Sequence, residues 1–274
     1  MHKLTRNPMR LCSGRLLRRA LFLISFFLSS SVSAQTLRIA AASDLQFAMP
    51  ELAAQCEKQT GVKLAVTYGS SGNFFAQIQN GAPFDLFFSA DVSYPHKLVV
   101  AQLADASSLQ VYAVGHLVLW LPPDTPLDPS AGLKILLDPR IQRIAIANPD
   151  HAPYGRAAVA ALRSAGLYEQ LQPKLVFGEN VSQAAQFVQT GSAQAGFLAY
   201  SLTLSPAMKS GKFWKIPADK YPPVEQAAVL LTASSNKEAA LSFLDFLKTP
   251  VARATLEKYG FFLPLAAAAT KHKL

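Results

Sequence analysis

The stretch Tyr68–Asn73, with the sequence YGSSGN, sets two hydroxyls and two glycines between a strand-like run and a helix-like run. Residues 62–68 are largely apolar and β-branched, which predicts a buried strand, and residues 74–81 have a helical pattern that ends at a glycine. Backbone N–H groups and serine hydroxyls at such a turn favour an anion site at the helix N-terminus. The alternative is ordinary capping of the helix by Ser70 or Ser71, and the turn by itself leaves both open.

Three further positions repeat this arrangement, because each follows a strand-like run and begins a helix-like run: Ser43-Asp44, Tyr154-Gly155 and Asn180-Val181. Ligands of α/β sheets bind beyond the carboxyl ends of the strands, where helices begin. None of the four loops contains a lysine, and Arg156 follows its loop inside a helix. Hydroxyls, main-chain N–H groups and helix dipoles suit a small dehydrated dianion. We expect the Asp44 carboxylate to cap its own helix and turn aside, which leaves its N–H for the ligand.

Strand and helix patterns alternate along the chain, which predicts an α/β protein with mostly parallel sheets flanked by helices. The extended run 109–121 is long for one strand, since strands usually have about five or six residues. Together with the run 225–231, it predicts two lobes joined by crossing strands, with the ligand in the cleft between them. Pro50 lies inside a helical pattern and predicts a kink or a helix that starts late.

The predicted domain organisation follows from these crossings and from the N-terminal composition. It comprises a signal peptide over residues 1–34, the first part of lobe I over 35–115, lobe II over 116–228, and a return segment of lobe I over 229–274. Residues 1–20 carry six positive charges and no acid, residues 21–28 are an apolar core, and cleavage is expected after Ala34. This pattern predicts a periplasmic protein.

The charge of the chain excludes one class of partner. Six of its 26 Lys and Arg residues lie in the predicted signal peptide, which leaves 20 against 17 Asp and Glu residues and a formal charge of +3. A surface near neutrality lacks the basic footprint of nucleic-acid binding. Cys56 is the one cysteine after the predicted signal peptide, and its helical spacing with Leu52 predicts a core position.

Catalytic patterns are weak in this sequence. The stretch Gly69–Gly72 lacks the Gly-x-Ser-x-Gly spacing of a nucleophile elbow, and there is neither a P-loop nor a dinucleotide fingerprint. The histidines after residue 34 show no metal-ligand spacing, and only His151 lies in a loop next to the predicted anion site. We therefore expect no enzymatic activity, no cofactor and no direct protein–metal ligand.

Several motifs in order resemble the periplasmic molybdate-binding proteins of ABC importers, and together they cover nearly the whole chain after residue 34. They are Ala41–Leu45, Tyr68–Gly72, Ala82–Asp91, Asn148–Arg156, Glu179–Val181 and Gly196–Ala199. The resemblance implies a two-lobed type II periplasmic-binding fold. It also implies capture of molybdate or tungstate, with the molybdenum held as its oxyanion, and delivery to an inner-membrane permease and its ATPase by a monomeric protein.

The resemblance also implies which residues bind the ligand: Ser43, Asp44 through its N–H, Ser71, Tyr154 and Val181 through its N–H. Some members of the family carry an oxyanion-binding tyrosine where this chain has Ala199. Others carry it in the Ala-Pro-Tyr-Gly loop, as Tyr154 does here, and this chain is assigned to that second group.

Two alternatives to molybdate binding remain at this point. The first is a binding protein for another tetrahedral oxyanion such as sulfate or phosphate. Phosphate is often protonated, and the Asp44 carboxylate would accept a hydrogen bond from its O–H group. The second, a remote one, is a secreted hydrolase that uses Ser71 as its nucleophile.

Overall fold

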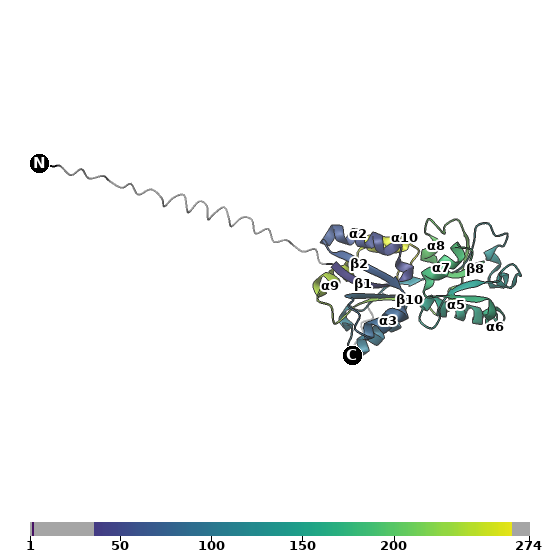
Figure 1. Cartoon of the computed structure of the whole chain (residues 1–274), viewed down its shortest axis with the longest axis horizontal. Coiled ribbons are helices and arrows are strands. Elements are labelled where there is room, and N and C mark those ends of the chain that lie inside the picture. Colours follow the sequence, from purple (N-terminus) through teal and green to yellow (C-terminus); the bar gives the residue numbers. More distant parts are fainter. Residues whose placement is uncertain (1, 3–35, 265–274) are drawn as a thin grey trace, which may run out of the picture. The chain divides into compact units, whose positions relative to one another are not determined.

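The computed structural model describes residues 36–264 together with His2, and the predicted signal peptide otherwise lies outside the described residues. The described chain builds two five-stranded sheets, each covered by helices (Figure 1). We call the first sheet with its helices the first lobe and the second sheet with its helices the second lobe.

The first sheet has the strand order β2-β1-β3-β10-β4. Its strands are β1 (Thr36–Ala42), β2 (Lys63–Gly69), β3 (Leu86–Ser89), β4 (Gln110–Gly115) and β10 (Val224–Leu230). β1 pairs in parallel with β2 and β3, whereas β10 runs antiparallel to both β3 and β4.

The second sheet has the strand order β7-β6-β8-β5-β9. Its strands are β5 (Leu117–Leu121), β6 (Ile144–Ala147), β7 (Leu175–Gly178), β8 (Ala195–Ala199) and β9 (Lys212–Lys215). β6 pairs in parallel with β7 and β8, and β5 runs antiparallel to β8 and β9.

Both sheets are therefore mixed, whereas the sequence predicted mostly parallel sheets. The difference comes from the strands that carry the chain between the lobes. β1, β3 and β4 end at the side of the first sheet that faces the second lobe, and the returning strand β10 enters at that side, so it runs opposite to them. β5 enters the second sheet in the same way, next to the ends of β6 and β8.

Helices follow most strands, as the alternating pattern predicts. The α-helices are α2 (Ala48–Thr60), α3 (Ser71–Gln79), α4 (Ser93–Val100), α5 (Pro153–Ser164), α6 (Tyr168–Leu171), α7 (Val181–Gln189), α8 (Tyr200–Thr203), α9 (Lys237–Phe246) and α10 (Pro250–Lys258). Short 3₁₀ turns are η1 (Ser43–Leu45), η2 (Ala106–Ser108), η3 (Pro129–Ala131), η4 (Leu133–Leu137), η5 (Gln172–Lys174) and η6 (Ala218–Lys220).

Side chains of β1 alternate between two buried layers of the first lobe. Ile39 and Ala41 pack with α2, α9 and α10 on one face, and Ala40 packs with α3 and α4 on the other. Figure 1 shows α2 and α10 on one side of this sheet and α3 on the opposite side. The second lobe has one large core around its sheet, which includes Phe197 and Trp120. Burial on both faces explains why the central strands are continuous apolar runs.

The long run 109–121 is divided at His116 into β4 of the first sheet and β5 of the second. The second crossing differs in detail from the prediction, because all of β10 pairs within the first sheet and the chain leaves the second sheet before Val224. The predicted lobe limits 35–115, 116–228 and 229–274 remain predictions, and we propose that the second limit lies before Val224. The helix around Pro50 starts late, with Pro50 in the first turn of α2.

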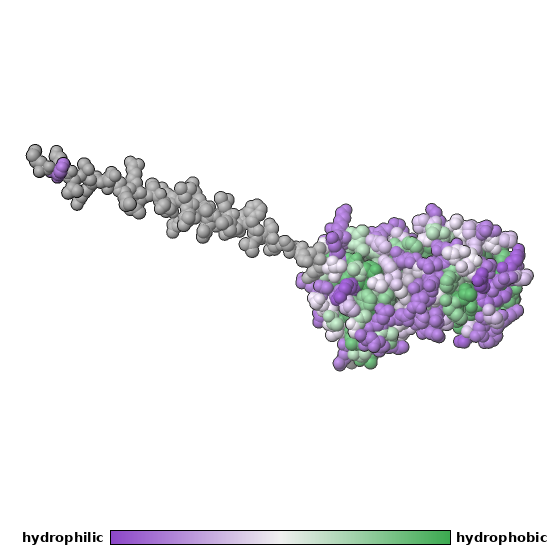
Figure 2. All heavy atoms as spheres, viewed as in Figure 1, coloured by the Kyte–Doolittle hydropathy of each residue, from purple (hydrophilic) through white to green (hydrophobic). Residues whose placement is uncertain are grey.

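The visible face of the described residues is mostly hydrophilic, with hydrophobic side chains in scattered groups (Figure 2). Within residues 36–264, the helices are too short or too polar to cross a membrane. Cys56 is fully buried and unpaired in the core of the first lobe, as its helical spacing predicts.

Candidate functional site: a pocket between the lobes

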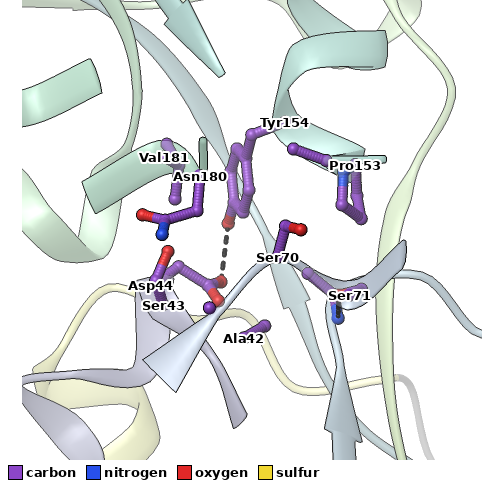
Figure 3. Close-up of a pocket in the computed structure, with 12 residues that line it drawn as sticks. Ala42, Ser43, Asp44, Ser70, Ser71, Pro153, Tyr154, Asn180 and Val181 are labelled. Atoms are coloured by element: carbon purple, nitrogen blue, oxygen red, sulfur yellow. Dashed lines mark hydrogen bonds between the residues drawn. The ribbon is translucent and has the colours of Figure 1, made fainter. Parts of the chain in front are cut away.

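One pocket lies where the carboxyl ends of the central strands of both lobes meet (Figure 3). Its wall contains all five residues that the sequence singled out: Ser43, Asp44, Ser71, Tyr154 and Val181. The first three come from the first lobe and the other two from the second. The structure thus brings the five residues together, whereas their role in ligand binding stays a prediction. The pocket is small, with an empty volume of about 200 Å³ including its open mouth.

Ser71 and Ser43 are held so that each hydroxyl hydrogen is free. The Ser71 Oγ accepts a hydrogen bond of 2.9 Å from the N–H of Ala90, and the Ser43 Oγ accepts one of 3.4 Å from the N–H of Ser182. A hydroxyl has one hydrogen to donate, and neither serine donates it to a described protein acceptor. Both oxygens border the pocket, so each can direct an O–H donor at an anion there.

Replacing Ser71 with alanine removes such a donor. A hydrogen bond to a charged acceptor contributes about 1.5–3 kcal/mol, so we expect anion affinity to fall tenfold or more. The N–H of Ala90 also loses its acceptor in a buried position, and we expect the free energy of unfolding to fall by about 1–3 kcal/mol. Titration calorimetry and urea unfolding measure the two effects separately. If the variant is destabilised but binds the anion as tightly as wild type, the role of Ser71 is limited to its hydrogen bond with the N–H of Ala90.

Three helices present N–H groups from their first turns to the pocket. Ser71 is the first residue of α3, Tyr154 the second of α5, and Val181 the first of α7. First-turn N–H groups have no acceptor within their own helix, and those of Ser71, Tyr154 and Val181 donate to no other acceptor within residues 36–264. The positive ends of three helix dipoles therefore meet at one small pocket, which favours an anion.

The capping residues of these helices are distinct from the ligand candidates. Asn180 caps α7 by accepting from the N–H groups of Ser182 and Gln183, as the sequence predicts. Ser70 caps α3 by accepting from the N–H of Asn73 at 3.4 Å, which leaves Ser71 free for the pocket. Capping is therefore confirmed for Ser70, and anion binding stays a prediction for Ser71.

The prediction that the Asp44 carboxylate caps its own helix is wrong. The segment after β1 is the short 3₁₀ turn η1, which has no side-chain cap. The Asp44 Oδ2 instead accepts from the Tyr154 hydroxyl at 3.0 Å, drawn as the dashed line in Figure 3, and from the Gln226 amide. The carboxylate prefers these donors because Asp44 is buried, at 1% exposure, where a charge without partners is costly.

The Tyr154 hydroxyl therefore donates its hydrogen to Asp44, and the backbone N–H of Tyr154 is the donor that remains for a ligand. Gln226 joins the same network, since its amide oxygen accepts from the Tyr112 hydroxyl at 2.7 Å. Neither Gln226 nor Tyr112 was among the residues predicted to form the site. The one feature of the sequence that could have indicated Gln226 is that it is the single amide side chain in the largely apolar strand β10.

Burial raises the pKa of Asp44 from 3.8 to about 6, although the hydrogen bonds from Gln226 and Tyr154 partly oppose this effect. The folded state therefore holds a proton on Asp44 at pH values where the unfolded chain has released it. No cation compensates the carboxylate, because within residues 36–264 Asp44 takes part in no ion pair. Arg156, the basic side chain next to the loop, pairs with Asp91 at 2.5 Å instead.

The raised pKa predicts a loss of stability as the pH rises. A shift of about two pKa units corresponds to about 3 kcal/mol, which is fully present below pH 4 and lost between about pH 4 and 6. Other carboxyls, such as Glu51, have lowered pKa values and oppose this trend. Urea unfolding of wild type and Asp44→Asn from pH 4 to 7 isolates the contribution of Asp44 as their difference. As the pH rises, we expect the free energy of unfolding of wild type to fall by about 3 kcal/mol relative to that of Asp44→Asn. A difference between the two proteins that does not change with pH would contradict the raised pKa of Asp44.

A second set of polar contacts joins the lobes beside the pocket. The Ser70 Oγ lies 2.9 Å from the Nδ1 of His151, and the N–H of Gly72 donates to the His151 carbonyl at 2.8 Å. The Asn73 amide donates to Glu179, whose Oε2 lies 3.9 Å from the His151 Nε2. These contacts connect the N-terminus of α3 with two loops of the second lobe.

The hydrolase alternative, which named Ser71 as the nucleophile, does not fit this geometry. The serine next to His151 is Ser70, which is engaged in capping α3. A general base must also be oriented by a third group within hydrogen-bond reach, and the 3.9 Å separation of Glu179 from His151 exceeds that reach. Ala199, the position at which some members of the family carry the tyrosine, is absent from the pocket wall.

The described residues offer no metal centre. Within residues 36–264, no group of three or more His, Cys, Asp or Glu side chains could hold a metal ion. The polar groups around the pocket are hydroxyls, backbone N–H groups, the Asn180 amide and the Asp44 carboxyl.

Comparisons with known proteins identify the family of the chain. Residues 37–262 match the family described as bacterial extracellular solute-binding protein. The molybdate-binding protein ModA of Rhodobacter capsulatus is 42% identical over 211 residues, which cover 77% of this chain and 82% of that protein. ModA of Azotobacter vinelandii is 40% identical over 241 residues, which cover 86% of this chain and 93% of that protein.

The fold comparison leads to the same proteins. The solved structure of the Azotobacter vinelandii periplasmic molybdate-binding protein has a TM-score of 0.79 and 36% identity, and the match covers 84% of this chain and all of that one. The two-lobed type II periplasmic-binding fold and the resemblance noted in the sequence motifs are thereby confirmed. These relatives are named for binding, which agrees with the prediction that the chain is not an enzyme.

Proposed function

Because the chain belongs to the family of bacterial extracellular solute-binding proteins, we propose that it binds molybdate in the pocket between its lobes. The observation that carries this proposal is the convergence on one small pocket of two serine hydroxyls and three helix N–H groups that donate to no acceptor among the described residues. Molybdate is a ligand of this site and not a cofactor.

The chemistry of the donors supports a tetrahedral dianion. Neutral donors placed at helix N-termini stabilise a dehydrated anion without a lysine or arginine. The pocket is small, because its empty volume of about 200 Å³ already includes open solvent at its mouth. This size favours a small oxyanion over a nucleotide.

We assign the ligand contacts to the hydroxyls of Ser43 and Ser71 and to the N–H groups of Asp44, Tyr154 and Val181. For the two serines, Tyr154 and Val181 the assignment rests on hydrogens that are donated to no acceptor within residues 36–264, and for Asp44 it rests on the resemblance to the molybdate-binding proteins. For Tyr154 it also rests on the engagement of its hydroxyl with Asp44, which leaves the N–H as the available donor.

The wider role follows from the relatives. Since they are molybdate-binding proteins and one is named as periplasmic, we propose that this protein acts in the periplasm after removal of residues 1–34. It would deliver molybdate, and also tungstate of nearly the same size and charge, to an inner-membrane permease and its ATPase, and would do so as a monomer.

Titration calorimetry on protein lacking residues 1–34 tests the proposal, with molybdate, tungstate, sulfate and phosphate in turn. Tight binding of the first two, with no heat from the others, is the expected result. Tight sulfate or phosphate binding would keep the role and change the ligand. Phosphate is the second candidate because Asp44 is a carboxyl in the pocket wall, and an ionised carboxylate accepts a hydrogen bond from a protonated oxyanion.

A further inference from the structure

Asp44 leaves one of its two carboxyl oxygens without a partner. The Oδ2 accepts from Tyr154 and Gln226, but the Oδ1 is buried and has no hydrogen-bond partner among the described residues. Buried polar atoms are nearly always hydrogen-bonded, so an orphaned oxygen needs an explanation. Asp44 lines the pocket, and a ligand there can supply the missing partner.

The groups that face Asp44 do not neutralise a negative charge. They are Tyr154 from α5, Tyr112 from β4 and Gln226 from β10. Burial keeps the pKa of each of these tyrosines above its usual value, so both of them are neutral at physiological pH. An ionised Asp44 would therefore face a bound dianion with no cation between them.

A protonated, neutral Asp44 removes both the orphaned oxygen and the repulsion between two negative charges. A protonated carboxyl has an O–H donor, and its second oxygen still accepts hydrogen bonds. With the proton on Oδ1, the orphaned atom gains a hydrogen to donate, while Oδ2 keeps its bonds from Tyr154 and Gln226. The charge repulsion disappears at the same time.

We propose that Asp44 binds the oxyanion as a neutral carboxylic acid, with its Oδ1–H donating to a ligand oxygen. This inference rests on the proposed function, since it assumes a dianion in this pocket. When Asp44 is ionised in the free protein, binding consumes one proton from solvent, which remains on the Oδ1 in the complex. Asp44 then selects a fully deprotonated oxyanion, because a neutral acid donates to the ligand and repels the hydrogen of a protonated one.

The direction of the pH dependence follows from the free protein. Burial raises the pKa of Asp44 to about 6, so the carboxyl is already neutral below that pH and the affinity is level there. Above pH 6, each further pH unit lowers the fraction of neutral Asp44 tenfold, and the affinity falls with it by up to tenfold.

Titration calorimetry with sodium molybdate tests this inference on protein lacking residues 1–34. Measurements at pH 5 and pH 8, each in two buffers of different ionisation enthalpy, give the number of protons taken up. We expect close to none at pH 5 and close to one at pH 8, with up to a hundredfold weaker binding at pH 8. Asp44→Asn carries an amide donor that needs no proton, so its affinity should no longer fall with pH. Asp150→Asn removes the same charge from an exposed position of the neighbouring loop and should keep the wild-type slope.

Different failures have different meanings. Tight molybdate binding by wild type without proton uptake at pH 8 would overturn the role of Asp44 and leave the proposed function intact. An Asp44→Asn variant with the wild-type slope would overturn it as well. No binding by wild type at either pH would overturn the proposed function together with this inference. The wild-type proton count decides the question even if the variant does not fold.

Discussion

Replacing Gly72 with alanine is expected to weaken molybdate binding by one to two orders of magnitude while the protein stays folded. Gly72 is the second residue of α3, and a Cβ there would lie 2.6 Å from the carbonyl oxygen of His151 and 2.8 Å from its Cα. Both atoms belong to the loop before α5 in the other lobe. The clash therefore opposes the approach of the two lobes around the pocket and not the fold of either lobe.

The magnitude follows from the cost of overpacking. Forcing an extra methyl group into a packed contact costs about 1–3 kcal/mol, or roughly 5- to 150-fold in affinity. Alanine in a helix is about 0.8–1.0 kcal/mol more favourable than glycine, so the stability of an open form should not fall. Gly72→Ala should therefore lower ligand affinity without lowering the stability of the open form. This difference distinguishes a defect in closure from a defect in folding.

Calorimetry and thermal unfolding of Gly72→Ala, with Gln77→Ala as a matched control, measure the two quantities. Gln77 lies on the exposed side of the same helix, and its truncation leaves the contact between the lobes unchanged. Affinity at the wild-type level in Gly72→Ala would show that the ligand-bound form does not contain the Gly72–His151 contact.

A second large effect is expected from Val181→Pro, which should weaken molybdate binding by at least tenfold. Proline at this position removes the N–H of Val181 and little else, since Val181 is the first residue of α7 and proline is favourable there. Asn180 before it is already extended, with φ −149° and ψ 176°, as a residue before proline must be. One hydrogen bond to a charged acceptor contributes about 1.5–3 kcal/mol, or roughly 10- to 150-fold.

Val181→Ala is the matched control, because it shortens the side chain and keeps the N–H. We expect its affinity to remain close to that of wild type in the same calorimetric titration. Circular dichroism of both variants checks that α7 is intact. If the proline variant binds as tightly as the alanine variant, the N–H of Val181 is not a ligand donor.

Local sequence patterns predicted the elements of the fold and the residues around the pocket. The serine turn after β2, the Asn180 cap of α7 and the Ala-Pro-Tyr-Gly start of α5 are encoded by a few adjacent residues, so each could be recognised without a structure. Because strand ends carry the sites of α/β proteins, the same patterns indicated that four distant segments meet. Family resemblance then supplied the ligand.

Sheet direction and the exact crossing points were not predictable in this way. Whether β10 pairs in parallel or antiparallel depends on which side of the first sheet the returning chain enters, and no residue of the strand itself carries that information. The predicted second boundary at 228 therefore fell inside a strand that belongs wholly to the first sheet.

The polar partners across the pocket were decided only by the tertiary structure. The sequence by itself determined that Asp44 would stand at a strand end near an anion site, and local rules predicted a helix cap for its side chain. The fold instead places the Tyr154 hydroxyl and the Gln226 amide beside it, from residues 110 and 182 positions further along the chain. Such contacts depend on how the two lobes pack, and the energy of a buried carboxyl depends on every group around it. For this reason the sequence could locate the site, whereas the state of its one carboxyl required the folded protein.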